Sequence, residues 1–400
     1  MNPWRGLRNL PREMWILFTA VLINRSGTMA LPFLALYLTQ GRGFTTGDAG
    51  LAITFYGAGS MITSPLAGRL SDRLGPLRIM KAALLLSGAL LLLFPLAKSF
   101  TMILTLAALW AIMSEAFRPA SLTIITELVA PEQRRAAFAL NRLAINLGMS
   151  IGPLVAGFLV LVSYPAIFVV DGVTSILAGI VLVVVPIRVR RQATKAAAES
   201  NAISDSPNEP ANVLARRTFL QFLLGLLLVD LVFFQIEAAM PLYLVRDLRL
   251  SESTYGMMFT LNTLLIIFIE VPLNLAMERW PHNKALALGA FFFGAGFGAM
   301  TFATGVFSVG MTVVVWTFGE MIVFPGSAAY VAEVAPVARR GQYMGFYNMT
   351  FSLAFAIGPW LGAQILERLG ATVLWSAAFM CGCLAAVIMR RLRTKNSLLE

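Results

Sequence analysis

The feature that most constrains this chain is its set of long apolar stretches. A membrane-crossing helix needs about 20 mostly apolar residues. Only 13% of the residues are charged, about half the share typical of soluble domains, and the mean hydropathy is +0.77. We therefore predict an all-α membrane protein with 12 transmembrane helices, at 13–38, 47–70, 77–98, 100–128, 135–162, 164–187, 217–245, 252–277, 283–304, 306–332, 340–366 and 370–391.

The basic residues indicate how these helices are oriented. With the N-terminus placed in the cytoplasm, 23 of the 31 Lys and Arg residues fall in cytoplasmic segments, five in external loops and three within the membrane. Cytoplasmic loops of membrane proteins carry such an excess of positive charge. The net charge of +11 therefore indicates topology rather than a nucleic-acid partner, and both termini are predicted to be cytoplasmic.

The residues that could bind a metal or a nucleotide are sparse. The single histidine, His282, falls in a loop, and Cys381 and Cys383 point to different faces of the last helix. No His/Cys cluster has metal-ligand spacing, and the sequence contains no G-x-x-x-x-G-K phosphate loop and no G-x-S-x-G elbow. We therefore expect no metal, no ATP and no enzymatic activity.

The chain repeats itself at an offset of about 206 residues. "SIGPLVAG" at 150–157, for example, corresponds to "AIGPWLGA" at 356–363. A polar segment rich in Ala, Ser and charge separates the two copies and is typical of a flexible linker. The predicted organisation is an N-terminal six-helix half (1–187), a cytoplasmic linker (188–216) and a C-terminal six-helix half (217–400).

Two motifs resemble those of the major facilitator superfamily, and the resemblance covers essentially the whole chain. "GRLSDRLGPLR" at 68–78 resembles the signature between the second and third helices, and "GMSIGPLVAG" at 148–157 resembles the fifth-helix motif of the drug/proton antiporter branch. The resemblance implies a fold of two pseudo-symmetric six-helix halves that move against each other. The residues expected to act in gating are Gly68, Asp72, Arg73, Gly75, Arg78, Glu127, Arg134, Gly148, Gly152, Pro153 and Gly157.

Ionisable residues inside the predicted spans cost about 2.5–3.5 kcal/mol each on insertion scales, so they suggest function. Most fall in the first, fourth, seventh and tenth spans, which line the central cavity in the superfamily. The proton-coupling candidates are Asp230, Glu237, Glu115, Glu320 and Glu270. The substrate-cavity candidates are Arg118, Asn24, Arg25, Phe234, Gln235, Asn262, Phe324 and Tyr347.

Glu115 and Arg118 lie three residues apart, on one face of the fourth span. They form either a fixed ion pair, or a pair that separates when substrate or a second acid competes for Arg118, so that Glu115 can take a proton. Pro119 predicts a kink beside them.

Helical spacing also places Asp230, Phe234, Glu237 and Pro241 on one face of the seventh span. The two acids have no cation on that face, so they reach Arg25 or Arg118 across the cavity or stay protonated.

Three further expectations concern side chains away from these two spans. Asn262, Glu270 and Asn274 share a stripe of the eighth span. Arg142 is expected to extend to the cytoplasmic surface, and the Phe-rich run at 291–302 is expected to face lipid.

Together these features predict a secondary transporter of the inner (cytoplasmic) membrane that works by alternating access. We expect proton-coupled efflux of amphipathic drug-like molecules, cations included, with the proton gradient as energy source and no cofactor. The alternatives are an exporter of an endogenous metabolite or lipid-like molecule, and a non-coupled facilitator or a transporter-shaped sensor. The expected partners are a small-molecule substrate, protons and the lipid bilayer, and we expect a monomer that binds no nucleic acid.

Overall fold

The computed structural model describes residues 10–130, 133–187, 217–336 and 340–392, in which all regular structure is helical. Eleven helical spans in these ranges are long and apolar enough to cross a membrane, and α3 is a twelfth long helix. The prediction of an all-α membrane protein with two six-helix halves is confirmed. The predicted linker lies outside the described residues.

Each half consists of six spans, several of them built from more than one helical segment. The N-terminal half contains α1 (Arg12–Ser26), α2 (Ala30–Leu36), η2 (Tyr37–Gly41), α3 (Thr46–Leu74), α4 (Pro76–Leu93), η3 (Phe94–Leu96), α5 (Phe100–Glu115), α6 (Phe117–Leu128), α7 (Arg134–Leu159) and α8 (Tyr164–Val184). The C-terminal half contains α10 (Arg217–Phe233), η6 (Phe234–Glu237), α11 (Ala239–Leu242), η7 (Tyr243–Asp247), α12 (Glu252–Ala276), α13 (His282–Ala299), η8 (Met300–Phe302), α14 (Val306–Val334), α15 (Arg340–Arg368) and α16 (Ala371–Arg390).

The internal repeat extends to irregular details of the backbone. The π-helical turns η2 and η7 begin at Tyr37 and Tyr243, and the 3-10 turns η3 and η8 begin at Phe94 and Met300. The offset is 206 residues in both cases. Both α3 and α12 start behind a hydroxyl residue: Thr45 accepts a hydrogen bond from the Asp48 backbone and Ser251 accepts one from the Thr254 backbone. The same local chemistry therefore starts the same helix in each half.

The first span is broken between α1 and α2, a feature that the sequence analysis did not predict. The backbone N–H groups of Met29 and Ala30 both donate to Oδ2 of Asp171 on α8, each at 3.0 Å. A carboxylate in this position satisfies the free donors at the start of a helix. The seventh span is interrupted at the equivalent place, where η6 ends and Ala238 has φ −134° and ψ −60°.

A third break, between α5 and α6, agrees with the kink predicted from Pro119. Proline has no N–H to donate to the carbonyl four residues earlier, and that residue is Glu115, the last of α5. The break turns the chain at Ala116, between Glu115 and Arg118.

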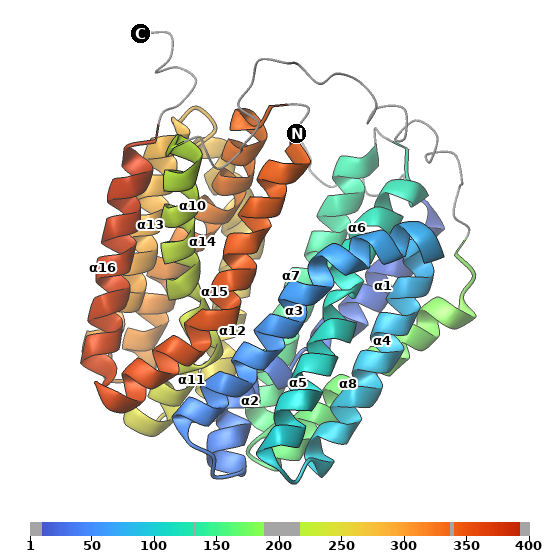
Figure 1. Cartoon of the computed structure of the whole chain (residues 1–400), viewed down its shortest axis with the longest axis horizontal. Coiled ribbons are helices and arrows are strands. Elements are labelled where there is room, and N and C mark those ends of the chain that lie inside the picture. The colour runs from blue at the N-terminus through green and yellow to red at the C-terminus, as the bar shows by residue number, and fades with distance from the viewer. Residues whose placement is uncertain (1–9, 131–132, 188–216, 337–339, 393–400) are drawn as a thin grey trace.

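The two halves lie side by side and meet along two pairs of helices, α7 with α12 and α3 with α15 (Figure 1). Small residues allow these backbones to approach closely. A Cβ added to Gly57 of α3 would lie 2.6 Å from Ala356 Cα of α15, and one on Gly157 of α7 would lie 2.7 Å from Ser253 Cα of α12.

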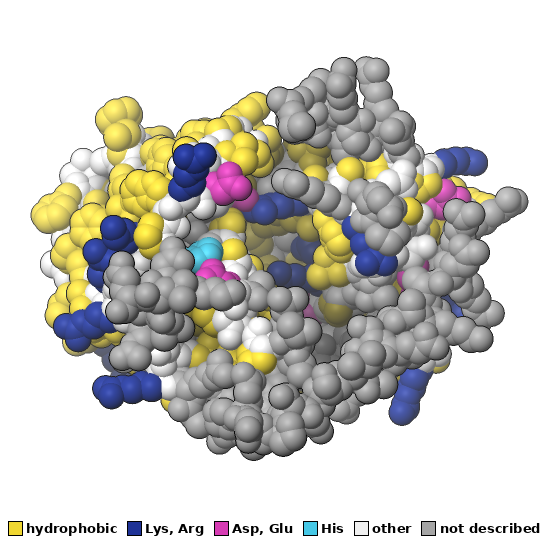
Figure 2. Space-filling model, turned by 90° about the horizontal axis from the view of Figure 1, so that it is seen from above, with side chains coloured by type: hydrophobic (Ala, Val, Ile, Leu, Met, Phe, Trp, Pro, Cys, Tyr) yellow, Lys and Arg dark blue, Asp and Glu magenta, His cyan; other side chains and the backbone are white. Residues whose placement is uncertain are grey.

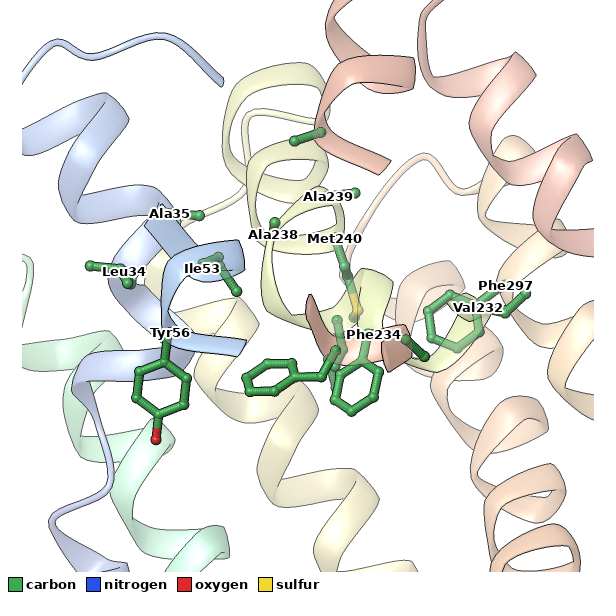
Figure 3. Packing of buried hydrophobic residues seen from close by; sticks show 14 of the residues in the cluster. Leu34, Ala35, Ile53, Tyr56, Val232, Phe234, Ala238, Ala239, Met240 and Phe297 are labelled. Atoms are coloured by element: carbon green, nitrogen blue, oxygen red, sulfur yellow. The ribbon is translucent and has the colours of Figure 1, made fainter. Parts of the chain in front are cut away.

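The halves are joined most tightly at the end of the bundle where α3 and α12 begin, which we call the closed end. Three hydrogen bonds cross between the halves there: Tyr164 hydroxyl to Glu252 (2.7 Å), Gly47 N–H to Glu367 (3.0 Å) and Arg246 to the Thr46 hydroxyl (3.3 Å). Behind them lies an apolar layer of Leu34, Ala35, Ile53, Ala238, Ala239 and Met240, in which the broken first and seventh spans pack together (Figure 3).

The opposite end, where α16 finishes, is hollowed between the two halves, and we call it the open end. Figure 2 looks onto this end and shows a central depression with Lys or Arg side chains on its wall. A second buried cluster, which includes Met14, Met80 and Leu182, belongs to the N-terminal half alone. The halves are therefore packed together at one end and apart at the other.

The Phe-rich run at 291–302 corrects an expectation. Phe302 is 81% exposed, as a lipid-facing side chain would be, but Phe293 and Phe297 are fully buried. The ring of Phe297 stacks on Trp316 of α14 at 5.4 Å. The prediction that this run faces lipid is wrong for these two residues, because α13 packs on both α14 and α16.

Candidate functional site

The N-terminal wall of the hollow carries two arginines on different spans. Arg118 follows the α5–α6 break, is exposed, and lies within electrostatic range of Tyr347 on α15 in the opposite half. Arg25 ends α1 and interacts electrostatically with Arg118, Glu115, Tyr56 and Asp171. The two arginines, one just before the break that follows α1 and one just after the break in the fourth span, are thus within electrostatic range of each other.

Glu115 is held by neutral hydroxyl groups. Its Oε1 accepts a hydrogen bond from the Tyr56 hydroxyl of α3 at 3.1 Å, and that hydroxyl also contacts Ser114 at 3.0 Å. Among the described residues, Glu115 forms no ion pair with Arg118 within 4 Å. The fixed Glu115–Arg118 pair, one of the two alternatives predicted, is therefore not what the structure contains.

The guanidinium group of Arg25 also lacks a close partner. Its Nε is buried, and within the described ranges it donates no hydrogen bond. Asn24 beside it points instead to α8, where its side-chain amide donates to the Ser175 hydroxyl at 3.1 Å. Asn24 therefore fixes α1 against α8, and Arg25 is the residue of this pair that faces the other charges.

The C-terminal wall contains a carboxyl group without a close partner. Asp230 of α10 is buried, and neither of its oxygens accepts a well-formed hydrogen bond from another described residue. The hydroxyl of Thr350 lies beside it on α15, and Tyr347, one turn earlier on that helix, interacts electrostatically with both Asp230 and Arg118. Tyr347 thus lies between the acid of one half and the base of the other.

Glu237 does not share a face with Asp230, contrary to prediction. Because η6 is wound more tightly than an α-helix and the chain breaks at Ala238, the spacing i, i+7 no longer returns to the same side. Glu237 lies near Tyr255 of α12, and its Oε2 is buried without a partner among the described residues. Pro241 belongs to the separate segment α11.

Aromatic side chains from several helices meet beside these charges. Phe234 packs on Phe351 and Phe355 of α15, with ring centroids 4.8 and 4.7 Å apart. Phe324 of α14 lies 6.2 Å from Phe351, and Tyr56 lies 5.7 Å from Phe355. Tyr56 therefore links the aromatic group to the charged group, since its hydroxyl binds Glu115.

Gln235 has a structural position rather than a place on the cavity wall. Its amide nitrogen donates to the backbone oxygens of Leu231 (2.8 Å) and Gly358 (3.1 Å), and its side chain fills the space beside Gly362. Its placement joins the end of α10 to α15. Gln235, one of the predicted substrate-cavity residues, therefore contacts the backbone of α15 instead.

A further acid, Glu320, belongs to a hydrogen-bond network between α12 and α14. The side-chain amide of Asn262 donates to Glu320 at 2.7 Å and to the Thr317 hydroxyl at 3.0 Å. Asn274 donates to the backbone oxygen of Met321 at 3.2 Å. Asn262 and Asn274 of the predicted stripe therefore contact α14.

Glu270, which lies between these two amides along α12, forms an ion pair with Arg142 of α7. The Arg142 side chain is 56% exposed, which agrees with the expectation that it extends toward the surface, but the ion pair was not predicted. Its charge is held by an acid of the other half, so the pair links α7 to α12 across the interface.

The motif residues near the open end are only partly described. Gly75 joins α3 to α4 with φ +88°, a conformation that favours glycine, and Arg73 and Arg78 are exposed on either side of it. Gly68 and Asp72 lie in α3, but the Asp72 side chain is outside the described part of the structure. Glu127 and Arg134 stand near the end of α6 and at the start of α7.

The fifth-span motif packs against the break in the first span and against the other half. Gly148 and Gly152 face the backbone from Arg25 to Thr28, and Gly152 would place a Cβ 2.8 Å from the Thr28 oxygen. Pro153 faces Gly256 of α12, and Gly157 faces Ser253 of the same helix. These residues support both the position of Arg25 and the interface between the halves.

Asp171 is a residue beside the site that the sequence analysis did not single out. It is an acid inside the apolar helix α8 and is 4% exposed, and that placement was the available signal. Its carboxylate shapes the first span close to Arg25. Within the described ranges no three His, Cys, Asp or Glu residues are grouped so that they could hold a metal ion.

The sequence of this chain is similar to a known protein family and to several known proteins. A family model described as the Major Facilitator Superfamily matches residues 16–251 and 222–398. The uncharacterized MFS-type transporter YqjV of Bacillus subtilis is 26% identical over 385 residues, 93% of this chain and 90% of that protein. A Na(+), Li(+), K(+)/H(+) antiporter of Planococcus maritimus is 23% identical over 366 residues, 84% and 85% of the two chains. Multidrug resistance protein MdtH of Aeromonas salmonicida is 21% identical over 380 residues, 90% and 93%.

Solved structures share the fold at low sequence identity. A peptide transporter POT in complex with sulfate aligns with a TM-score of 0.80 at 16% identity and covers 97% of each chain. A D-xylose-proton symporter aligns with a TM-score of 0.75 at 15% identity, covering 96% of this chain and 97% of that one. The arrangement of helices is therefore that of known transporters.

Proposed function

Because this chain belongs to the major facilitator superfamily, a family of transporters rather than enzymes, we propose that it exports amphipathic small molecules in exchange for protons. Its class is that of a secondary transporter, embedded in a membrane by multiple helices. In the proposal it resides as a monomer in the cytoplasmic membrane with both termini in the cytoplasm, so the open end faces the cytoplasm.

The observation that carries the proposal is the unpartnered Asp230 opposite the two arginines. A carboxyl group held away from water and from cations holds its proton more tightly than an exposed one. Asp230 is 1% exposed, and its neighbour Tyr347 interacts with Arg118 across the hollow. In our proposal a proton on Asp230 changes the electrostatic potential at a substrate bound beside Arg118, and the substrate changes the potential at Asp230. Proton binding and substrate binding are therefore coupled.

Movement of the two halves supplies the transport step. The α7–α12 and α3–α15 interfaces contain glycines at which the two backbones approach closely, which permits sliding contacts. We propose that the hydrogen bonds at the closed end break while the open end closes, so that the central site changes the side it faces. Glu320 and Glu237 are further proton-carrying candidates in this scheme.

The names of two relatives support exchange and export. One is an antiporter of monovalent cations and protons, and one is a multidrug resistance protein. Neither name assigns a substrate to this chain. We base the amphipathic substrate on the neighbouring aromatic and charged groups, Phe351 and Phe324 on one side and Arg118 on the other.

Purified protein in proteoliposomes tests the proposal. A pH gradient is imposed across the vesicle membrane, and accumulation of naphthalene probes carrying a carboxylate, a hydroxymethyl or an aminomethyl group is followed. Proton-coupled export predicts probe movement that requires the gradient and reverses with it, together with substrate-dependent proton movement in the opposite direction. Probe movement that is independent of the gradient would instead show a non-coupled facilitator and would contradict the proposal.

A further inference from the structure

The charges on the N-terminal wall of the hollow do not balance. Arg25 and Arg118 lie within electrostatic range of each other, and Glu115 is both the acid that acts most strongly on Arg25 and the acid three residues before Arg118. The carboxylate of Asp171 also acts on Arg25, but it already accepts two backbone hydrogen bonds from α2. Arg25 and Arg118 therefore share Glu115, because the carboxylate of Asp171 is already used to cap α2.

Neither guanidinium group is neutralised by a close contact. Within the described ranges no ion pair under 4 Å involves Arg25 or Arg118, and the buried Nε of Arg25 has no hydrogen-bonding partner. Glu115 instead accepts a hydrogen bond from the Tyr56 hydroxyl. The Nε of Arg25 is buried without a partner and Arg118 stands close to it, so a bound anion would satisfy that donor and reduce the repulsion between the two cations.

An apolar surface adjoins the two cations. The ring of Tyr56, whose hydroxyl binds Glu115, packs on Phe355 at 5.7 Å and on Trp110 at 4.7 Å. Phe351 of the same aromatic group is only partly buried, as is Tyr347 one turn away. An anionic group beside the arginines and an aromatic or alkyl body on these rings would occupy one continuous surface.

We propose that the transported molecule is an amphipathic anion whose carboxylate, sulfonate or phosphate group binds between Arg25 and Arg118 and whose apolar part lies against the partly exposed rings of Phe351 and Tyr347. Guanidinium groups suit this task because they present several donors in a plane to such oxyanions. The proposal rests on the proposed transport function and narrows its substrate class, from amphipathic molecules in general to those with a negative charge.

Equilibrium binding to the full-length protein in lipid nanodiscs, without any pH gradient, tests this assignment. The probes are 2-naphthoate, 2-naphthalenemethanol and 2-naphthylmethylammonium, which share the apolar body and differ in charge. We expect 2-naphthoate to bind about tenfold more tightly than the alcohol, a difference typical of a charge-assisted contact, and the ammonium probe to bind most weakly. Equal binding of all three, preference for the ammonium probe, or no binding of 2-naphthoate would overturn the proposal.

Variants locate the contact. Arg118→Gln and Arg25→Gln should each lower the affinity for 2-naphthoate about tenfold while changing that for the alcohol less than about twofold. Arg118→Lys should recover part of the loss, since it restores the charge but not the planar fork. Arg368→Gln, an exposed arginine at the end of α15, is the matched control and should bind as the unaltered protein does. A glutamine variant that is folded and binds 2-naphthoate normally would overturn the site.

The two proposals fail in different ways. Tight binding of 2-naphthoate without gradient-driven movement keeps the anion site and overturns proton exchange. Gradient-driven movement of the ammonium probe, with no binding of 2-naphthoate, keeps proton exchange and overturns the anion site.

Discussion

The buried charges of this protein differ in whether they have a partner, and that difference separates their roles. Asp171 caps a helix and Glu270 pairs with Arg142. Glu320 accepts a hydrogen bond from Asn262. Asp230 has no such contact among the described residues, apart from the neighbouring Thr350 hydroxyl. A group so weakly held can change its charge without disrupting the helices around it.

Asp230→Asn is therefore expected to remove coupling and to leave the fold intact. The amide keeps the size of the carboxyl group but cannot carry a proton, so we predict at least a tenfold loss of gradient-driven probe accumulation in proteoliposomes. Thermal stability in detergent should be unchanged or raised, because a buried acid without a partner is replaced by a neutral group. Glu278→Gln, at an exposed acid that follows α12, serves as the control. Retention of full coupling in Asp230→Asn would exclude this residue as the carrier.

At the scale of single elements, the first span depends on an acid from another helix. Replacing Asp171 with Ala removes the acceptor for both Met29 and Ala30 and leaves two buried N–H groups unsatisfied. We predict a loss of about 1–3 kcal/mol in the free energy of unfolding, seen as a lower Tm. Asp171→Asn should lose less, since its side-chain oxygen can still accept. Equal stability of Asp171→Ala and the unaltered protein would mean that the carboxylate does not hold the break.

The α7–α12 contact offers a second test at this scale. A Cβ on Gly256 would collide with the backbone oxygen of Pro153, whereas Gly345 of α15 has open space around its Cα. Gly256→Ala should therefore separate the two helices and lower transport severalfold, and Gly345→Ala should leave transport unchanged while adding helix propensity. Both variants remain helical, so circular dichroism should not distinguish them. Equal transport by the two would show that the close approach of α7 and α12 is dispensable.

These elements also show how far sequence reasoning reaches. The spans and their repeat were predictable because apolar length and motif spacing are local properties. The break before α2 was not, because its stabilising acceptor is 142 residues away from Met29. Likewise, helical spacing could place Arg142 on its own helix but carried no information about Glu270 in the other half. Asp230 and Glu237 would share a face on an unbroken α-helix, but helical spacing alone does not reveal that the seventh span is interrupted.

At the scale of the whole molecule, the two halves form a closed end and an open end around the charged site. The fold class was predictable, since the repeat implies two similar halves. Which end is closed was not, because the same sequence must support both arrangements in a transporter that alternates. Such a change has to rearrange polar contacts between the halves, among them the ion pair between Arg142 and Glu270, the Thr260 hydrogen bond to the Ser150 backbone oxygen and the three hydrogen bonds at the closed end.

The most direct test of alternating access is a pair of spin-label distances measured by pulsed electron paramagnetic resonance. Spin labels are placed at Val162 and Phe307, exposed at the closed end, and in a second protein at Leu74 and Leu275, exposed at the open end. Cys381 and Cys383 are first replaced by serine. When pH and 2-naphthoate are varied in nanodiscs, we predict that the closed-end distance increases as the open-end distance decreases. Distances that stay fixed, or that change in the same direction at both ends, would contradict the account.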